Sequence, residues 1–176
     1  MPSMSFALKE NSHRAAAIDM AKIFTEAKAV QHIQQQLKLK GDVFQKEIDS
    51  LEAQARSQAD ALEKDKEKLP HLKFVQRQEE IQKKVVLFQN LAIQRKAQVD
   101  KAYESAMGKV KKTFQNVIAE VANDRSLAIV FPMQQIVYMD QNLALDITNE
   151  VMRKLDKKLP KVTVVFSKKG EETNAK

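Results

Sequence analysis

The chain has 176 residues, within the range of one domain, and combines 30% charged with 43% hydrophobic residues but only three Gly, four Pro, two Tyr and no Trp. This bias toward Ala, Glu, Lys, Leu and Gln is typical of long helices or coiled coil. Cysteine is absent, which excludes disulfides, cysteine nucleophiles and thiolate metal sites, and the net charge of +7 favours acidic partners such as nucleic acid, anionic lipid or acidic proteins.

The N-terminal part is polar over residues 1–14, and we expect it to be a flexible segment. It lacks the continuous apolar core of a signal peptide, so the sequence alone does not show export. No apolar run in the chain approaches the ~20 residues that a membrane-spanning helix needs. The short apolar run from Ala15 to Met20 then predicts a buried strand.

A helical period begins after this run and continues through the middle of the chain. Two interleaved series of apolar residues, each spaced by seven, predict one apolar seam along a helix. The series are Leu37, Phe44, Leu51 and Ile48, Ala55, Leu62, Leu69. Pro70 interrupts the pattern because proline cannot continue a helix without losing a hydrogen bond. The period resumes from Val75 to Val121, so the sequence predicts an antiparallel helical hairpin with arms of about 40 and 50 residues.

The sequence after the arms returns to short elements. Asn123–Ser126 end the second arm, and the apolar runs 127–131 and 136–139 predict two strands of a hairpin. Asp146 is placed to cap a helix whose apolar residues share one face. These residues are Ile147, Val151 and Leu155. Val162 to Phe166 forms a further strand-like run.

Strands on both sides of the arms have to meet, so the hairpin is an insertion in a small base. The predicted fold class is therefore α+β, mostly helical, with long antiparallel coiled-coil arms inserted in a small β/α base. We expect the base to comprise residues 15–29 and 123–159, and the arm to comprise residues 30–122. Residues 160–176 are left as a C-terminal extension.

Catalytic and metal-binding patterns are missing from the sequence. His13, His32 and His71 are not at metal-ligand spacing, and we expect surface histidines, no enzyme activity, no metal and no cofactor. Gly41 and Gly108 interrupt predicted helices, where each costs about 1 kcal/mol relative to Ala. Each glycine marks a point where the arm can bend, a position of close packing, or a position where glycine is merely tolerated.

Positive charge is concentrated in the second arm. Residues 30–69 carry seven basic and eight acidic residues, whereas residues 70–122 carry ten basic and five acidic ones. The basic clusters are Lys83, Lys84, Arg95, Lys96, Lys109, Lys111 and Lys112. Nucleic-acid binding would require aromatic residues interleaved with these charges for base stacking, and this feature is missing. Contact with anionic lipid or lipopolysaccharide stays open.

The order of elements resembles the Skp (OmpH) family of periplasmic chaperones over residues 15–159. The matching runs are Ala17-Ile18-Asp19-Met20 with Ile23-Phe24, Ala128 to Phe131, Ile136-Val137-Tyr138, and Asp146-Ile147-Thr148 leading into Val151 and Leu155. The arms match in length and character only.

The resemblance implies a homotrimer in which strands from three chains close one β-barrel, with three hairpins around a central cavity. Such chaperones hold unfolded outer-membrane proteins, their clients, in the periplasm without ATP. A closed barrel would also remove exposed strand edges. We expect the basic residues of the arm to attract clients. We expect the trimerisation core to be formed by Ile18, Leu127, Ile129, Val137, Ile147, Val151 and Leu155.

Two other functions remain open at this point. A cytosolic hairpin chaperone similar to prefoldin shares the plan of arms on a barrel, but it would lack the Asp146-Ile147-Thr148 helix. A structural or nucleic-acid-binding coiled-coil protein would bind DNA with a steep dependence on salt.

Overall fold

The computed structural model describes residues 15–140 and 142–166, which divide into two compact units. The base unit contains residues 15–32 and 107–162, and the arm unit contains residues 33–106 and 163–166. The base unit therefore includes the roots of both long helices. The predicted N-terminal segment and the end of the C-terminal extension lie outside the described residues.

A two-stranded parallel sheet forms part of the base. Strand β1 (Ala15–Ile18) pairs with strand β2 (Ile129–Pro132), with Ala15 opposite Ile129. Parallel strands need a long crossover connection. Here the crossover contains the helices α1 (Met20–Glu26), α2 (Lys28–Lys64) and α3 (His71–Asp124). The prediction that strands before and after the arms meet is confirmed.

The predicted strand over residues 136–139 is wrong, and so is its hairpin with β2. After Pro132 the chain forms a short 3-10 helix (Met133–Gln135), and the Ile136 N–H donates to the Met133 carbonyl at 3.1 Å. The other edge of β1 is occupied instead by the segment that leads into helix α4 (Thr148–Lys158). The Ala17 N–H donates to the Leu145 carbonyl at 2.8 Å, and the Ala17 carbonyl accepts from the Ile147 N–H at 3.0 Å.

Helix α4 begins one residue later than predicted, with Ile147 instead of Asp146 as its N-cap residue. The Asp146 Oδ1 accepts a hydrogen bond from the Thr148 N–H at 2.8 Å, which satisfies one of the free donors at the helix start. The expected apolar face is also present, because Val151 and Leu155 are fully buried together with Ile147. They complete a base core to which α1 and α3 contribute Ile23, Val110, Val117 and Val121.

Helix α3 ends at Asp124, inside the predicted 123–126 boundary. Ser126 adopts a left-handed conformation with φ of 53°, and the Leu127 N–H donates to the Ala122 carbonyl at 2.8 Å. This is the hydrogen bond of a Schellman motif, in which glycine usually occupies the left-handed position. A serine there costs backbone energy that glycine would not.

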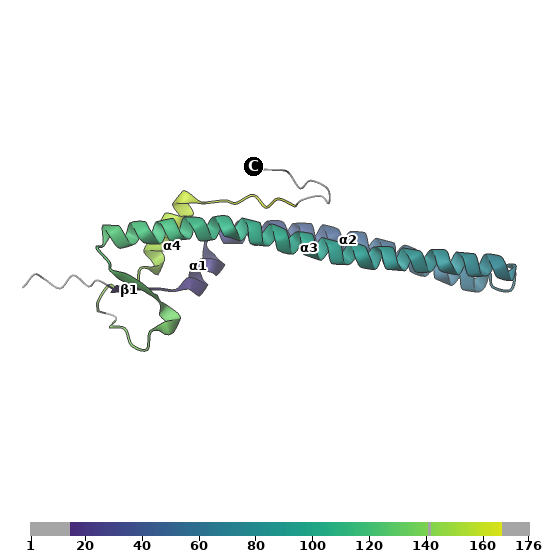
Figure 1. Cartoon of the computed structure of the whole chain (residues 1–176), viewed down its shortest axis with the longest axis horizontal. Helices are drawn as coiled ribbons and strands as arrows, with labels where there is room; N and C mark the ends of the chain where they lie inside the picture. Colours follow the sequence, from purple (N-terminus) through teal and green to yellow (C-terminus); the bar gives the residue numbers. More distant parts are fainter. Residues whose placement is uncertain (1–14, 141, 167–176) are drawn as a thin grey trace, which may run out of the picture. The chain divides into compact units, whose positions relative to one another are not determined.

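The arm unit confirms the predicted antiparallel hairpin, as Figure 1 shows for α2 and α3. Arg95 pairs with Glu47, and the Lys84 Nζ donates to the Gln58 Oε1 at 2.7 Å. Both contacts belong to one antiparallel register. The helices contain 37 and 54 residues, and the turn falls at residues 65–70. The seam is only partly buried: Phe44, Ala55 and Leu62 are covered, whereas Leu51 is exposed.

Both helical glycines lie within continuous helices. A Cβ atom added at Gly41 or at Gly108 would meet no atom within 4 Å, so close packing does not explain either residue. No described helix is both long enough and apolar enough to cross a membrane. The predicted strand at Val162–Phe166 is wrong as a strand, because this stretch pairs with no other strand in the described part of the chain.

Candidate functional site

An apolar surface remains uncovered at one edge of the base sheet. Within the described residues β2 pairs only with β1, so the outer edge of β2 is open. Ile129 and Phe131 are exposed on this strand, and Val137 and Tyr138, a few residues later, are almost completely exposed. We call these four residues the assembly surface. Open strand edges and large apolar patches are normally covered by a partner.

A hollow of about 470 Å³ lies within the same unit and touches this surface. It is lined by the three alanines of β1, by Phe131 and Tyr138, and by the apolar side chains of Ile136 and Leu145 among others. Ala15 to Ala17 have small side chains and leave room above the strand. The hollow therefore offers space for apolar side chains from outside the chain.

The predicted trimerisation core is divided between two environments. Ile18, Ile147, Val151 and Leu155 are buried inside the single chain, where they form its own core. Leu127 is half-buried. Ile129 and Val137, in contrast, are exposed and available to another chain. Phe131 and Tyr138 were not among the residues predicted for the trimerisation core. Phe131 lies two residues after Ile129, and Tyr138 directly follows Val137.

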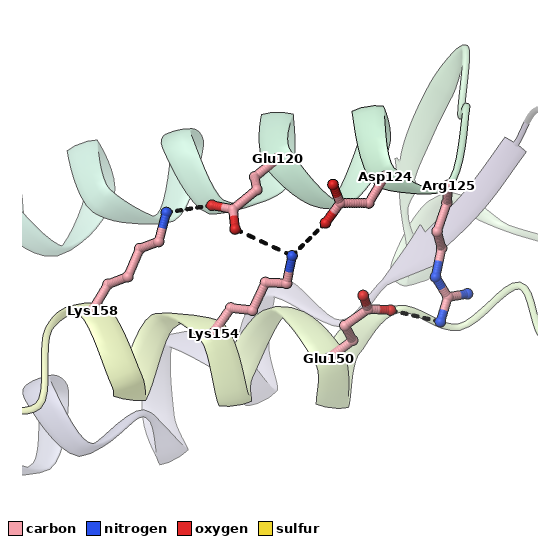
Figure 2. Close-up of polar contacts among 6 residues, drawn as sticks. All are labelled: Glu120, Asp124, Arg125, Glu150, Lys154 and Lys158. Carbon is pink, nitrogen blue, oxygen red and sulfur yellow. Dashed lines mark hydrogen bonds and ion pairs between the residues drawn. The ribbon is translucent and has the colours of Figure 1, made fainter.

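A network of ion pairs connects α4 to the last turns of α3 (Figure 2). The Lys154 Nζ lies 2.6 Å from the Asp124 Oδ2 and 3.2 Å from the Glu120 Oε1. Glu120 also pairs with Lys158. The hydrogen bonds from Lys158 and Lys154 lower the pKa of Glu120, and the bond to Asp124, followed by that to Glu120, raises the pKa of Lys154.

A second ion pair holds the start of α4. The Arg125 Nη2 lies 2.6 Å from the Glu150 Oε2 (Figure 2). The Arg125 Nη1 also donates to the Ala144 carbonyl at 3.2 Å. Glu150 is in the first turn of α4, where a negative charge is favoured by the helix dipole. No local sequence signal predicts these contacts, because their partners are 19 to 38 residues apart.

The seven basic residues predicted to attract clients do not form one cluster. Arg95 is already engaged: its Nε and Nη2 donate to both carboxylate oxygens of Glu47, and its guanidinium lies 4.5 Å from the centre of the Phe44 ring. Lys84 donates to Gln58. Lys83 and Lys96 are exposed in the arm unit and form no ion pair with any described residue.

The remaining three predicted residues are exposed in the base unit, at Lys109, Lys111 and Lys112. They too form no ion pair with the residues that the structure describes. Charges that are exposed and unpaired attract acidic partners over longer distances than neutralised ones do. Lys84 also qualifies, because its hydrogen bond to the neutral Gln58 leaves its charge uncompensated. Six of the seven residues therefore remain suited to the predicted role: Lys83, Lys84, Lys96, Lys109, Lys111 and Lys112.

Large apolar side chains are also exposed on the arm unit. Leu39 and Val43 on α2 and Leu87 and Ile93 on α3 are all more than half exposed. The seam accounts for the buried apolar residues of the hairpin, so these side chains are in excess of what the hairpin needs. They offer weak, distributed apolar contacts to a partner.

The histidine predictions have different outcomes. His71 is exposed as expected, but His32 is partly buried, and its Nδ1 lies 3.0 Å from the Val162 carbonyl oxygen. The prediction of a surface histidine is therefore wrong at position 32, and His13 lies outside the described residues. Within residues 15–140 and 142–166, no group of His, Cys, Asp or Glu side chains is arranged to hold a metal ion.

Comparisons with known proteins agree on one family. The profile of the family described as "Outer membrane protein (OmpH-like)" matches residues 14–155. A crystal structure from Caulobacter crescentus, of a protein assigned as an outer membrane chaperone (OmpH-like), superposes with a TM-score of 0.82 and 16% sequence identity, covering 98% of each chain. At this identity the likeness establishes a shared fold. No curated protein matches the sequence.

Proposed function

The chain belongs to the OmpH-like outer membrane protein family, and on that premise we propose that it is an ATP-independent holdase chaperone. Its clients would be unfolded outer-membrane β-barrel proteins in the periplasm, which it keeps from aggregating before they insert into the membrane. The chaperone assignment of the structurally similar Caulobacter protein supports a role of this class. A holdase needs reversible contacts and no reaction chemistry.

The observation that carries this proposal is the excess of exposed apolar side chains on the paired helices. Leu39, Leu87 and Ile93 do not take part in the core of the hairpin, yet each exposes more than 60% of its surface. Each side chain contributes only a small free energy on partial burial, at about 25 cal/mol per Å². Several such contacts together retain an unfolded chain but still allow it to leave.

The assembly surface supports a homotrimer as the working form. The free edge of β2 and the exposed Val137 and Tyr138 would be covered by neighbouring copies of the chain. Closure of the strands into one barrel would eliminate the open edge. In this assembly the arms of three chains would enclose a client, and the exposed lysines would speed its capture, since bacterial outer-membrane proteins tend to be acidic.

A shortened arm tests the proposal. Removing two heptads from each helix, residues 51–64 and 78–91, keeps the turn, the register of the hairpin and the Arg95–Glu47 pair. It also removes exposed apolar side chains such as Leu87. An unfolded outer-membrane protein is diluted from urea, and its aggregation is followed by light scattering with each form of the chaperone.

The intact chain should suppress scattering, and the shortened chain should suppress it much less while remaining folded by circular dichroism. An arm variant that suppresses aggregation as well as the parent would refute the role of the arms. Salt-sensitive binding of the intact chain to duplex DNA, without effect on the client, would favour the nucleic-acid alternative.

A further inference from the structure

The chain continues past α4 into a segment that packs along the arm. The matched family region ends at residue 155, and residues 163–166 belong to the arm unit although they follow the base in sequence. Val164 is 7% exposed, whereas its neighbours Thr163 and Val165 are exposed. Burial of every second side chain is the pattern of an extended chain lying on a surface. We call residues 163–166 the strap.

The strap is held by groups that recognise the backbone and apolar side chains. The Val164 N–H donates to the Gln36 Oε1 at 3.0 Å. The Phe166 ring meets the Phe44 ring edge-on, with their centres 6.5 Å apart. The Lys40 Nζ lies 4.7 Å from the centre of the Phe44 ring and 5.8 Å from that of Phe166.

This recognition does not depend on a particular sequence. A side-chain amide that accepts from a backbone N–H can do so for any residue except proline. An aromatic ring with a cation beside it accepts any aromatic side chain. The surface formed by Gln36, Lys40 and Phe44, here called the strap site, therefore fits an extended chain with apolar residues at alternate positions and an aromatic one among them.

The inward side chains of the strap match part of the pattern of a membrane β-strand. Strands of outer-membrane barrels alternate apolar and polar residues, and aromatic residues flank the apolar band. Val164 and Phe166 are the inward pair of the strap, and of its two outward residues Thr163 is polar and Val165 is apolar. One residue earlier, in the base unit, Val162 is also buried, so the alternation extends over Val162, Val164 and Phe166.

We propose that the strap site binds extended segments of unfolded outer-membrane proteins, and that the strap occupies it as an internal stand-in which a client displaces. This inference rests on the proposed holdase function. The strap pairs with no strand in the described part of the chain, so no sheet has to be broken for it to leave. Because it is tethered, it competes at an effective concentration of about millimolar, and only clients that present several suitable segments displace it readily.

Displacement can be measured in the full chain because it contains no native cysteine. Cysteines introduced by Val165→Cys and Leu39→Cys, both at exposed positions, carry spin labels on the strap and on α2. The distance between the labels should be short and narrowly distributed without client. It should become longer and broader when an unfolded outer-membrane protein is added. An unchanged distribution at saturating client overturns the proposal.

Binding to the site is measured with a fluorescent peptide that repeats the alternation of Val162 to Phe166. A second peptide of the same composition, with its apolar residues contiguous, serves as the ligand control. Release of the strap by V164S and F166S should tighten binding of the alternating peptide by about tenfold, because the site is no longer occupied. The matched variant V165S changes an exposed valine and should leave the affinity unchanged.

Failure of this inference can be distinguished from failure of the proposed function. If the chain suppresses client aggregation but the label distance does not change and V164S/F166S binds the peptide like the parent, the strap is only structural. If neither the parent nor V164S/F166S suppresses aggregation, the holdase function itself is wrong. Additional substitution of the site by K40A and Q36A should cancel the gain seen in V164S/F166S, and retention of that gain also overturns the proposal.

Discussion

The base and the arm are both rich in helix, but they bury their apolar residues to different extents. In the base, several side chains of α4 and of the root of α3 are completely inaccessible to solvent, among them Val117, Val151 and Leu155. In the arm, the seam covers Phe44 and Leu62, while Leu87 and Ile93 face solvent. Densely packed interiors tolerate little change, whereas partly exposed surfaces tolerate much. The base is therefore suited to define structure and assembly, and the arm to contact variable partners.

The largest effect is expected inside the base, at Val151. Val151 is fully buried, and burying a charge at such an apolar position costs several kcal/mol. V151D should unfold the base unit, seen as loss of the cooperative thermal transition by circular dichroism. V43D, at an exposed valine of α2, is the matched control and should melt like the parent.

The same change at Val137 should act on assembly alone. Val137 is fully exposed in the single chain, so V137D does not disturb the core of its own base. We expect folded monomers by light scattering, because an aspartate would be buried at each interface of the proposed trimer. A trimeric V137D variant would show that the assembly surface has been wrongly placed.

Charge reversal of the exposed lysines should have a smaller, kinetic effect. Changing Lys83, Lys96, Lys111 and Lys112 to Glu leaves the Arg95–Glu47 pair of the hairpin intact. Association with an unfolded outer-membrane protein should slow by about tenfold or more at low salt, since steering by charge acts mainly on the association rate. Stopped-flow fluorescence at two salt concentrations measures this rate. Capture at the parent's rate in low salt would mean that the lysines only keep the arm soluble.

The network around Glu120 should make the base sensitive to acid. Its pKa is lowered from the ordinary value of 4.5, mainly by the hydrogen bonds from Lys158 and Lys154. A lowered folded-state pKa means that the stabilisation is present above pH 4.5 and is lost as the pH falls through the folded value. E120Q should therefore lower the melting temperature at pH 7, and its difference from the parent should shrink at pH 3.

E104Q is the control for this comparison, since Glu104 is exposed on the same helix and forms no ion pair with a described residue. It should melt like the parent at both pH values. Equal melting of E120Q and the parent at pH 7 would show that the network contributes nothing measurable, as is common for exposed ion pairs.

The smallest effect concerns the end of α3. Ser126 has a positive φ of 53° at an exposed position, where glycine avoids the steric cost that a Cβ atom imposes. S126G should stabilise the base by about 1 kcal/mol, measured by urea denaturation. The neighbouring substitution A128G, on an exposed alanine outside the left-handed position, should give no such gain. A destabilised S126G would mean that the serine side chain has a role of its own.

Elements with a regular period were predictable from sequence. The seven-residue spacing from Leu37 to Leu69 and the interruption at Pro70 predicted the hairpin, because helix periodicity and proline geometry are local properties. The start of α4 was predictable to within one residue for the same reason, and Asp146 accepts from the first helical N–H although it is not the N-cap residue. The strand prediction failed at residues 136–139, where β-branched residues suit a strand but the chain leaves β2 through a 3-10 helix at Met133–Gln135 and, within the described residues, does not return along its open edge.

Long-range contacts of the candidate site were not predictable. The sequence could not show that Val162 to Phe166 packs on α2 instead of joining a sheet, nor that Arg95 is neutralised by Glu47. It also could not separate Ile18 and Val151, which are buried in the chain's own core, from Ile129 and Val137, which are exposed. All these residues are apolar and lie in similar patterns, and only the tertiary structure decides which face each one occupies.

The proposal that the base assembles the trimer and the arms bind the client is tested most directly by the mass of the complex with a client. The chain, at 20.1 kDa, is mixed with one unfolded outer-membrane protein diluted from urea, and the soluble species are measured by native mass spectrometry. We predict a species of three chains with one client, which is lost with V137D and weakened by shortening the arm. Soluble client bound equally well by monomeric V137D, or no complex with the intact chain, would contradict the proposal that the base assembles the arms into a holdase.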